Sequence, residues 1–380
     1  MKETSRSFDV VIVGGGVCGS FLAGLLGKKR KVLLIESDTH PSPLGRRISV
    51  SGNGRCNFFN EDLLFEDNLP SFLEPLKNHF FHEGRKYPIE TLSFLKDKLG
   101  IRYFKEGKLY YPYFNRAECV RNPILKALEN SLVENKTDFV ERIDRKSHSI
   151  YLRDEKEPLK YSRLVFCVGG RSYDRKDFEP RLFSSLGLPY RPFLPSLCPL
   201  LVAEKIPSYL VGQRLRGKVS LLCGKKVVAV EEGEVLFRRD ALSGIAVFQL
   251  SRIYDDMVSH GEKGPFSLAV DYSEHDGCSG LGSGMDSLPL FLLRYLKECR
   301  KKLFEPLSFG VASCASFENS QVGYGGLDLS SFDWDFSLLE DRAFFAIGEC
   351  LDVNLPCGGY NIGTSLIEAF VVADSLGGLS

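Results

Sequence analysis

The sequence predicts an α/β protein in which both ends of the chain build one parallel sheet, with a mainly antiparallel β segment inserted between them. Three observations lead to this prediction. Near the N-terminus, a β-branched run leads into a glycine-rich loop and an apolar helix. Near the other end, an apolar strand leads into Gly-Glu and a second glycine-rich loop. Between them, short apolar runs are separated by turn residues, as in β-hairpins.

The first observation is a strand–loop–helix pattern. Val10 to Val13 are β-branched and predict a short strand that is buried on both faces. Glycines follow with the spacing G-x-G-x-x-G. In such a loop Gly14 permits a tight turn, Gly16 lets the backbone approach a pyrophosphate, and Gly19 lets the helix lie close to the strand. Residues 20–26 are mostly apolar and continue the helix, whose first N–H groups suit a diphosphate.

A second strand over residues 31–35 completes this unit and ends on Glu36. The Glu36 carboxylate can accept hydrogen bonds from ribose hydroxyl groups, and it would repel a 2′-phosphate. A lone G-x-G-x-x-G is a weak signal, because glycine is common in turns. Strand, loop, helix, strand and acid in this order predict a dinucleotide site rather than an ordinary βαβ turn.

The elements that follow lead to a third apolar strand. Residues 45–57 are rich in glycine, asparagine and arginine; they predict a loop that approaches a ligand or, alternatively, a basic surface loop. His79 and His82 can share a helix face, but without a third ligand nearby no metal site is predicted. The strand over 163–168 ends in Gly169, where the backbone can pass close to a ligand of the first loop. The other elements expected here are helices over 71–99, broken at Pro75 and Pro88, and over 117–133, a hairpin over 103–112, and strands over 139–143 and 149–152.

Prolines cluster from Pro189 to Pro199 and mark a domain boundary. We therefore expect one domain from residues 1–192 and 322–380, and a second from the inserted residues 193–321. The insertion is expected to hold a hairpin over 219–230, a strand over 234–237, helices over 243–254 and 288–303, and a Gly/Ser-rich exposed loop over 275–286.

The last part of the chain is predicted to return to the first domain. A buried strand over 343–347 ends at Gly348 and Glu349, and a helix over 362–375 follows Gly358 and Gly359. This second glycine loop offers another helix N-terminus to a ligand. No second G-x-G-x-x-G follows a strand, so the sequence predicts one dinucleotide site of this type.

Composition limits the kinds of partner that we expect. Lys+Arg equals Asp+Glu at 49 each, so the net charge gives no electrostatic attraction to nucleic acid or to an acidic membrane. The N-terminus is polar, and no apolar run approaches the roughly twenty residues of a membrane span. The eleven cysteines include no C-x-x-C pair. They are expected to be reduced and mostly buried, as in a cytoplasmic protein.

Several motifs together carry a resemblance to a known family. They are the opening loop, residues 51–57 (SGNGRCN), the Gly169-Gly170 corner, Gly348-Glu349 and residues 358–361 (GGYN). With these motifs the chain resembles the BaiN-type flavoprotein family, which is described as NAD(P)/FAD-dependent oxidoreductases and sometimes as an aminoacetone oxidase family. The resemblance extends over nearly the whole chain. It implies a glutathione-reductase-like, Rossmann-like FAD-binding domain with an inserted β domain and a reduced helical segment.

The resemblance also implies which residues hold FAD. Gly14, Gly16 and Gly19 would take the pyrophosphate, Glu36 the adenosine ribose, and Glu349 the ribityl chain. Residues 54–57 would lie near the flavin, and N–H groups of residues 359–362 would face its pyrimidine edge. The full set of implied cofactor residues is Gly14, Gly16, Val17, Cys18, Gly19, Glu36, Gly54, Arg55, Cys56, Asn57, Gly169, Gly348, Glu349, Gly359, Asn361 and Ile362.

The function expected from this resemblance is hydride transfer between flavin N5 and a small organic substrate or NAD(P)H. Tyr360, Arg55 and Tyr173 are the candidate proton donors or orienting groups, with packing around the flavin as the alternative role. Cys56, Cys350 and Cys357 lack the paired spacing of a disulfide reductase.

Two other functions are weighed against this one. Departures from the family pattern after Gly170, in residues 172–177, and a short segment between residues 252 and 322 motivate the first, a flavin-binding regulatory or redox-sensing protein with weak or no turnover. The second, an NAD-linked dehydrogenase without flavin, is disfavoured by the Gly348-Glu349 motif. Neither the substrate nor the oligomeric state is specified by these motifs.

Overall fold

The structure is a computed structural model that describes residues 8–129, 131–172, 180–272, 288–302 and 305–379. The chain divides into two compact units. The first takes in the described parts of Met1–Gly170, Arg175–Phe193 and Tyr324–Ser380, and the second those of Arg171–Asp174 and Leu194–Gly323. The sequence placed the inserted domain at residues 193–321. Each unit is described separately below.

A six-stranded sheet forms the centre of the first unit, in the order β19-β20-β10-β1-β2-β6. All of its neighbouring pairs are parallel except β19–β20. Strand β1 lies between β2 and β10, and β10 in turn pairs with β20, so strands from both ends of the chain share one sheet. The strands are β1 (Val10–Val13), β2 (Val32–Glu36), β6 (Val133–Thr137), β10 (Leu164–Phe166), β19 (Ser337–Leu338) and β20 (Asp341–Ala346).

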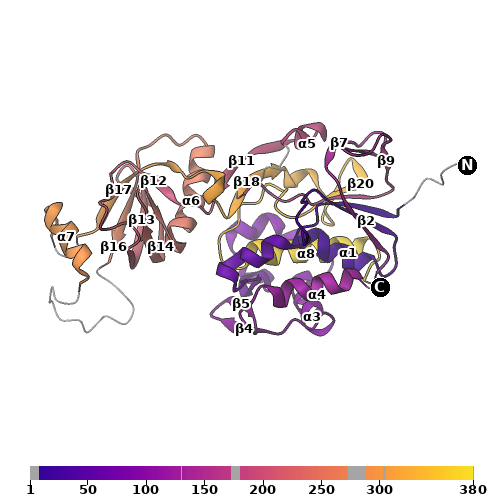
Figure 1. The fold of residues 1–380 in the computed structure, drawn as a ribbon, viewed down its shortest axis with the longest axis horizontal. Coiled ribbons are helices and arrows are strands. Elements are labelled where there is room, and N and C mark those ends of the chain that lie inside the picture. Colours follow the sequence, from indigo (N-terminus) through magenta and orange to yellow (C-terminus); the bar gives the residue numbers. More distant parts are fainter. Residues whose placement is uncertain (1–7, 130, 173–179, 273–287, 303–304, 380) are drawn as a thin grey trace, which may run out of the picture. The chain divides into compact units, whose positions relative to one another are not determined.

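Two apolar helices pack side by side in this unit (Figure 1). Helix α1 (Val17–Leu26) is buried at every position from Cys18 onward, and helix α8 (Tyr360–Ser375) is buried from Gly363 to Ala373. Helices that are apolar on all sides in this way belong to the interior of a domain. The shorter helices of the unit are α2 (Lys77–Phe80), α3 (Tyr87–Asp97), α4 (Glu118–Glu129) and α5 (Pro180–Ser185).

Two helices of the first unit are shorter than predicted from the sequence, as is α7 (Leu290–Glu298) of the second unit, which was expected over 288–303. The region 71–99 divides into a 3₁₀ turn over Ser71–Leu76 followed by α2 and α3, with Pro88 in the first turn of α3. The helix expected over 117–133 ends at Glu129. Residues Val133–Thr137 form the edge strand β6 instead, paired with β2. Two small antiparallel sheets complete the unit: β3 (Phe59–Asn60), β4 (Tyr103–Glu106) and β5 (Leu109–Pro112) in one, and β7 (Val140–Asp144), β8 (Ser149–Leu152) and β9 (Leu159–Lys160) in the other.

The second unit is a closed antiparallel barrel, in the order β12-β15-β14-β13-β16-β17. Its own core includes Val219, Leu221, Val235 and Leu268, which are completely buried. The barrel strands are β12 (Leu200–Val202), β13 (Arg214–Cys223), β14 (Lys226–Phe237), β15 (Ala241–Ser243), β16 (Phe266–Asp271) and β17 (Leu307–Cys314), with helices α6 (Ile245–Ser259) and α7 (Leu290–Glu298). The loop predicted over 275–286 lies outside the described residues.

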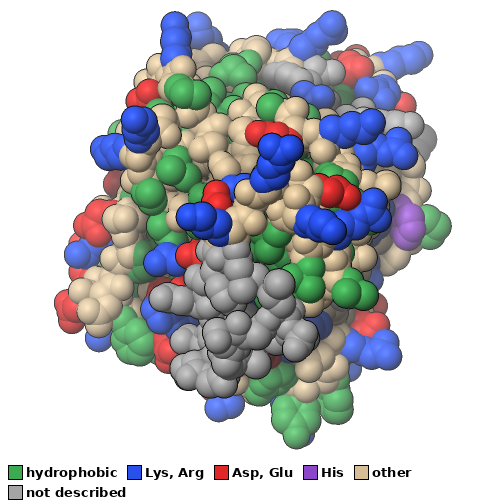
Figure 2. Space-filling view, turned by 90° about the vertical axis from the view of Figure 1, so that its left-hand side faces the viewer, with side chains coloured by type: hydrophobic (Ala, Val, Ile, Leu, Met, Phe, Trp, Pro, Cys, Tyr) green, Lys and Arg blue, Asp and Glu red, His purple; other side chains and the backbone are tan. Residues whose placement is uncertain are grey.

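Charges of both signs share the outer surface of the barrel. On the long β13–β14 ladder, Arg216 lies opposite Glu234, and Lys218 lies opposite Glu232. Figure 2 likewise shows Lys and Arg side chains with acidic and apolar side chains between them. The chain enters the barrel along β11 (Tyr190–Ser196) and leaves it along β18 (Val322–Leu327), and these two strands pair with each other.

Candidate cofactor site

The glycine loop after β1 shows two different uses of glycine. Gly14 has a φ of +111°, and a Cβ there would collide with the backbone carbonyl of Cys167. A Cβ on Gly19 would collide with the carbonyl oxygen of Gly14. A Cβ on Gly16, in contrast, would meet no atom within 4 Å. Gly14 and Gly19 therefore allow close packing of the protein with itself, whereas Gly16 faces open space that a ligand can approach.

Helix α1 begins at this loop and presents unpaired N–H groups. Its first internal hydrogen bond runs from the N–H of Ser20 to the oxygen of Gly16, at 2.9 Å. The N–H groups of Val17, Cys18 and Gly19 therefore have no partner within the helix, and they carry the positive end of the helix dipole. The open space at Gly16 and these donors together fit the pyrophosphate of a dinucleotide. The Cys18 thiol donates to the oxygen of Ser365 at 3.1 Å, so only its backbone is available.

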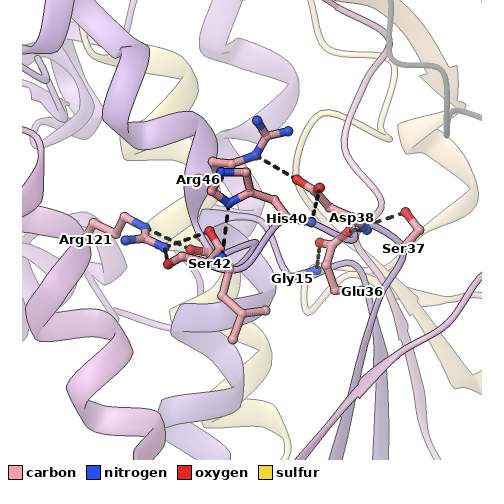
Figure 3. Close-up of polar contacts among 9 residues, drawn as sticks. Gly15, Glu36, Ser37, Asp38, His40, Ser42, Arg46 and Arg121 are labelled. Atoms are coloured by element: carbon pink, nitrogen blue, oxygen red, sulfur yellow. Dashed lines mark hydrogen bonds and ion pairs between the residues drawn. The ribbon is translucent and has the colours of Figure 1, made fainter.

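The carboxylate of Glu36 lies beside the same loop (Figure 3). Its Oε2 accepts the N–H of Gly15 at 2.7 Å, and its Oε1 accepts the N–H of Asp38 at 2.9 Å. The following loop is held in place by Arg46, whose Nε lies 2.7 Å from the Asp38 carboxylate. Glu36 is thus oriented beside the loop that would hold a pyrophosphate, where an adenosine ribose would come within its reach.

The turn after β20 brings a second acid to the same edge of the sheet. Glu349 accepts the N–H of Gly170 at 3.4 Å, and its carboxylate lies 3.9 Å from the guanidinium of Arg47. These three residues come from three separate segments, and the sequence analysis had assigned Glu349 and the Gly169-Gly170 corner to the cofactor site. The carboxyl ends of adjacent parallel strands meet here, where open α/β sheets bind their ligands.

The SGNGRCN and GGYN segments bind each other directly. With its amide oriented to satisfy both of its groups, Asn57 accepts the N–H of Gly359 at 3.2 Å and donates to the oxygen of Phe59 at 3.1 Å. Asn60 donates to the oxygen of Gly358 at 2.7 Å. Gly359 has a φ of +84°, and a Cβ there would collide with the Phe59 carbonyl. We call this set of contacts, formed by Asn57, Phe59, Asn60, Gly358 and Gly359, the asparagine clasp.

The asparagine clasp fixes the start of helix α8. The first internal hydrogen bond of α8 runs from Gly363 to the oxygen of Gly359, at 3.1 Å. The N–H groups of Tyr360, Asn361 and Ile362 therefore have no partner within the helix. The N–H of Gly359 is taken by Asn57, so the donors available to a ligand begin one residue later than the family resemblance implies.

The structure gives defined surroundings to two of the three candidate catalytic residues. The hydroxyl of Tyr360 donates to Asp62 at 2.6 Å, its ring is buried edge-on against Phe72, and burial raises its pKa. Arg55 pairs with Glu106 at 2.8 Å and stacks over the ring of Tyr111 at 4.3 Å. Tyr173 lies outside the described residues. Both described side chains thus hold neighbouring segments, and their catalytic roles stay predictions.

The cysteines near the site are buried rather than paired. Cys18, Cys167 and Cys350 donate to backbone carbonyls, and burial raises the pKa of each thiol. Burial also raises the pKa of Cys56 to about 11. The described cysteines form no disulfide, and the described residues contain no group of three or more His, Cys, Asp or Glu suited to a metal ion. Within the same residues, no helix is long and apolar enough to cross a membrane.

Glu368 is a buried acid that the sequence analysis did not single out. It is 1% exposed within the apolar helix α8, and its Oε2 accepts the N–H of Gly348 at 2.5 Å. Burial raises its pKa to about 8, and the hydrogen bond from Gly348 opposes this shift. A single acid in the otherwise uncharged run from Gly363 to Ala373 was the available signal. Its position behind the Gly348–Glu349 turn makes it part of the frame of the site.

The chain is similar to known proteins along nearly its whole length. The model of the HI0933-like protein Rossmann domain matches residues 8–375. The chain is 48% identical to the ribosomal RNA dihydrouridine synthase of Escherichia coli, over 97% of this chain and 98% of the relative. It is 24% identical to a 3-dehydro-bile acid delta(4,6)-reductase of Clostridium scindens, over 92% of this chain and 94% of the relative.

Solved structures share the fold at low sequence identity. A flavocytochrome c3 fumarate reductase superposes with a TM-score of 0.52 and 12% identity, covering 97% of this chain and 78% of that one. A 3-ketosteroid delta1-dehydrogenase of Sterolibacterium denitrificans gives 0.50 and 10%, covering 97% and 99%. Fold and family are those of FAD-binding flavoproteins. The chain therefore belongs to the HI0933-like Rossmann-domain family.

Proposed function

We propose that this chain is an FAD-dependent reductase of a carbon–carbon double bond that is conjugated to a carbonyl group. The names of its relatives support this reaction. Formation of dihydrouridine saturates the C5–C6 bond of uracil, which is conjugated to the C4 carbonyl. A delta(4,6)-reductase of a 3-dehydro-bile acid acts on double bonds conjugated to the 3-oxo group. The two relatives thus share one type of bond, although their substrates are chemically unrelated.

The observation that carries the proposal is the pair of helix N-termini at one edge of the parallel sheet. The start of α1 would hold the pyrophosphate, while Glu36 and Glu349 would bind the two sugar-like parts of the cofactor. The free N–H groups at the start of α8 would lie at the pyrimidine edge, where they stabilise negative charge. Bound FAD, once reduced, supplies a hydride at N5.

The substrate we propose first is uridine in ribosomal RNA. Two relatives carry this name, at 48% and 26% identity against 24% for the bile acid reductase, and both match the chain over nearly its full length. The balanced charge of the chain predicts no long-range attraction to RNA, so recognition must come from a local surface. A small conjugated ketone, in line with the name of the bile acid reductase, is the second candidate.

The reaction balances with NAD(P)H as the proposed electron donor. FAD would supply the two electrons from NAD(P)H as a hydride to one carbon of the double bond, and the neighbouring carbon would take a proton from solvent or a side chain. Tyr173 and Tyr360 are the candidate donors of that proton. In the structure the Tyr360 hydroxyl donates its hydrogen bond to Asp62. A role as proton donor therefore requires the phenol proton to turn from Asp62 to the substrate, and a new proton to reach the phenol through the Asp62 carboxylate.

The test uses the purified full chain. We expect flavin absorption bands that bleach with NADH or NADPH under anaerobic conditions. Ribosomal RNA transcribed in vitro, which holds unmodified uridine, should then yield a nucleoside heavier by two hydrogen atoms. Reduction of a 3-oxo-4,6-diene steroid but not of the RNA would select the second candidate. Bleaching with no reduction of either substrate would favour a redox-sensing role, and protein that binds no FAD would overturn the proposal.

A further inference from the structure

Two neighbouring aromatic side chains project from the turn after β5 in the first unit. Tyr113 is 60% exposed and Phe114 is 70% exposed. Their rings meet edge to face, with centroids 5.3 Å apart. Large adjacent aromatic rings left in water are unusual for surface side chains without a partner, and they mark a place of interaction. We call residues 113–116 the aromatic turn.

The aromatic turn is held firmly on its own side. Tyr113 donates its N–H to the oxygen of Arg102 at 2.9 Å, and Asn115 donates its N–H to the oxygen of Pro112 at 2.8 Å. Arg55 donates from Nε to the side chain of Asn115 at 3.2 Å while its guanidinium rests on the Tyr111 ring. The rings are therefore presented on a braced backbone, which lowers the entropy cost of binding.

The aromatic turn is joined to the cofactor site through the chain. The N–H of Ala117, directly after the turn, donates to the oxygen of Gly54 at 2.9 Å. Gly54 and Arg55 lead straight into Asn57, whose side chain binds Gly359 at the start of α8. Two neighbouring residues of the SGNGRCN segment, Gly54 and Arg55, thus brace the exposed rings, and Asn57 positions the helix that faces the flavin. A ligand on the turn and a ligand at the flavin would share this support.

The chemistry of the turn fits unpaired nucleotide bases. Sequence-tolerant recognition of single-stranded RNA uses aromatic rings on which bases stack, next to cationic side chains that meet the phosphates. Arg102 is exposed beside Tyr113, and Arg116, whose side chain is 70% exposed, follows Phe114 by two residues. Aromatic and arginine side chains are also enriched at protein interfaces, so a protein partner is included among the outcomes of the test below.

We propose that the aromatic turn is a stacking platform for an unpaired RNA base next to the uridine that is reduced. This inference rests on the proposed function and adds the RNA-binding surface to it. A target base has to leave its stack to reach a buried reactive centre, and a neighbouring base that stacks on Tyr113 or Phe114 would hold the strand open.

The test compares the double variant Tyr113→Ala/Phe114→Ala with Phe65→Ala. Phe65 is a matched control, since it is also an exposed phenylalanine of the first unit, at 50% exposure. Binding is measured by fluorescence anisotropy with a labelled single-stranded oligouridylate, and turnover with the ribosomal RNA transcript. The double variant should bind the oligouridylate about tenfold more weakly or worse. Its KM for RNA should rise, while kcat, FAD content and bleaching by NAD(P)H stay as in the unchanged chain.

Further arms separate the possible failures. The variant Tyr113→Phe/Phe114→Tyr keeps both rings and should restore binding. Unchanged oligouridylate affinity in the alanine variant would overturn the stacking platform even if the chain reduces uridine. Oligouridylate binding that depends on the rings, without any uridine reduction, would overturn the proposed function alone. A change from dimer to monomer in sedimentation, with RNA affinity unchanged, would show that the rings cover a second copy of the chain and would overturn the proposal.

Discussion

Single glycines in the first loop separate folding from cofactor binding. Gly19 faces the backbone of Gly14 at a distance that excludes any Cβ, whereas Gly16 faces open space. A methyl group at these two positions should therefore have different effects. At Gly19 the protein must shift to make room, and at Gly16 the methyl group fills space that a ligand uses.

The first prediction concerns these two glycines. Gly19→Ala should lower the free energy of unfolding of the cofactor-free protein by about 1–3 kcal/mol, because it overpacks a closed contact. Gly16→Ala should leave that free energy within about 0.5 kcal/mol but weaken FAD binding at least about tenfold. Urea unfolding without FAD and fluorescence titration with FAD measure the two effects. Unchanged FAD affinity in Gly16→Ala would show that the pyrophosphate does not approach this loop.

The buried acid Glu368 should make the free energy of unfolding depend on pH. Burial raises its pKa in the folded chain to about 8, from an ordinary value near 4.5 in the unfolded chain. Between these two pH values Glu368 is protonated in the folded chain but ionised in the unfolded chain. The stability that this side chain contributes is therefore fully present below about pH 4.5 and is lost as the pH rises through about 8. Glu368→Gln cannot titrate and can still accept the N–H of Gly348. The free energy of unfolding of Glu368→Gln, relative to that of the unchanged chain, should therefore increase from pH 5 to pH 8.5 by up to about 4 kcal/mol.

Urea unfolding at several pH values measures this difference. Glu66→Gln is the control, because Glu66 is an exposed acid of the same unit. Its stability should follow that of the unchanged chain at every pH. Equal pH dependence of the unchanged chain and Glu368→Gln would show that Glu368 is ionised in the folded protein.

At the scale of elements, the asparagine clasp joins Asn57 and strand β3 to the start of helix α8. The Asn57 amide satisfies two backbone groups, the N–H of Gly359 and the oxygen of Phe59. Replacing Asn57 by Ala should cost about 1–2 kcal/mol of stability, because both groups lose a partner. FAD affinity should fall as well, since the first N–H groups of α8 lose their fixed position.

Thermal unfolding and FAD titration measure these two effects. Asn319→Ala, which removes an amide bonded to Arg238 in the barrel, is the control and should change neither quantity appreciably. A destabilised Asn57→Ala with normal FAD affinity would mean that the clasp serves folding alone.

Elements with strong local patterns could be predicted from the sequence. The β1–α1–β2 unit, the β4–β5 hairpin and the β20–α8 pair each depend on residues close in sequence, such as the glycines and the apolar run before them. Strand β6 could not be predicted, because Val133–Thr137 is largely polar and becomes a strand only by pairing with β2. Strands β16 and β17 were likewise missed. They close the barrel through pairs with β13 and β12, which no local pattern specifies.

The same distinction holds within the site. The loop glycines, Glu36 and Glu349 could be assigned to a candidate site from motifs, because a bound dinucleotide would dictate residue type and spacing. The partners Asp62 for Tyr360 and Glu106 for Arg55 depend on how distant segments fold together. For that reason the sequence suggested Tyr360 and Arg55 among its catalytic candidates without indicating the carboxylates that hold them.

At the scale of the whole molecule, the two units have separate cores. FAD should therefore stabilise the first unit and leave the barrel unchanged. At a free concentration one hundred times its dissociation constant, FAD should add about 2.7 kcal/mol to the unfolding free energy of the first unit. Hydrogen exchange followed by mass spectrometry can separate the two, with β1 and α8 reporting the first unit and β13 the second. Equal protection of β13 by FAD would show that the units unfold together.

The packing of α1 against α8 has a consequence for synthesis of the chain. Cys18 bonds to Ser365, which lies 347 residues further along the chain. On the ribosome, α1 emerges early, yet the helix that covers it is made after every other described element. The barrel is contiguous and can fold in the meantime, whereas the side of α1 that packs against α8 stays uncovered until α8 is made. Transcripts that stop before α8 should thus yield chains that chaperones retain and proteases remove. In the cell, FAD should bind only chains whose synthesis has passed α8.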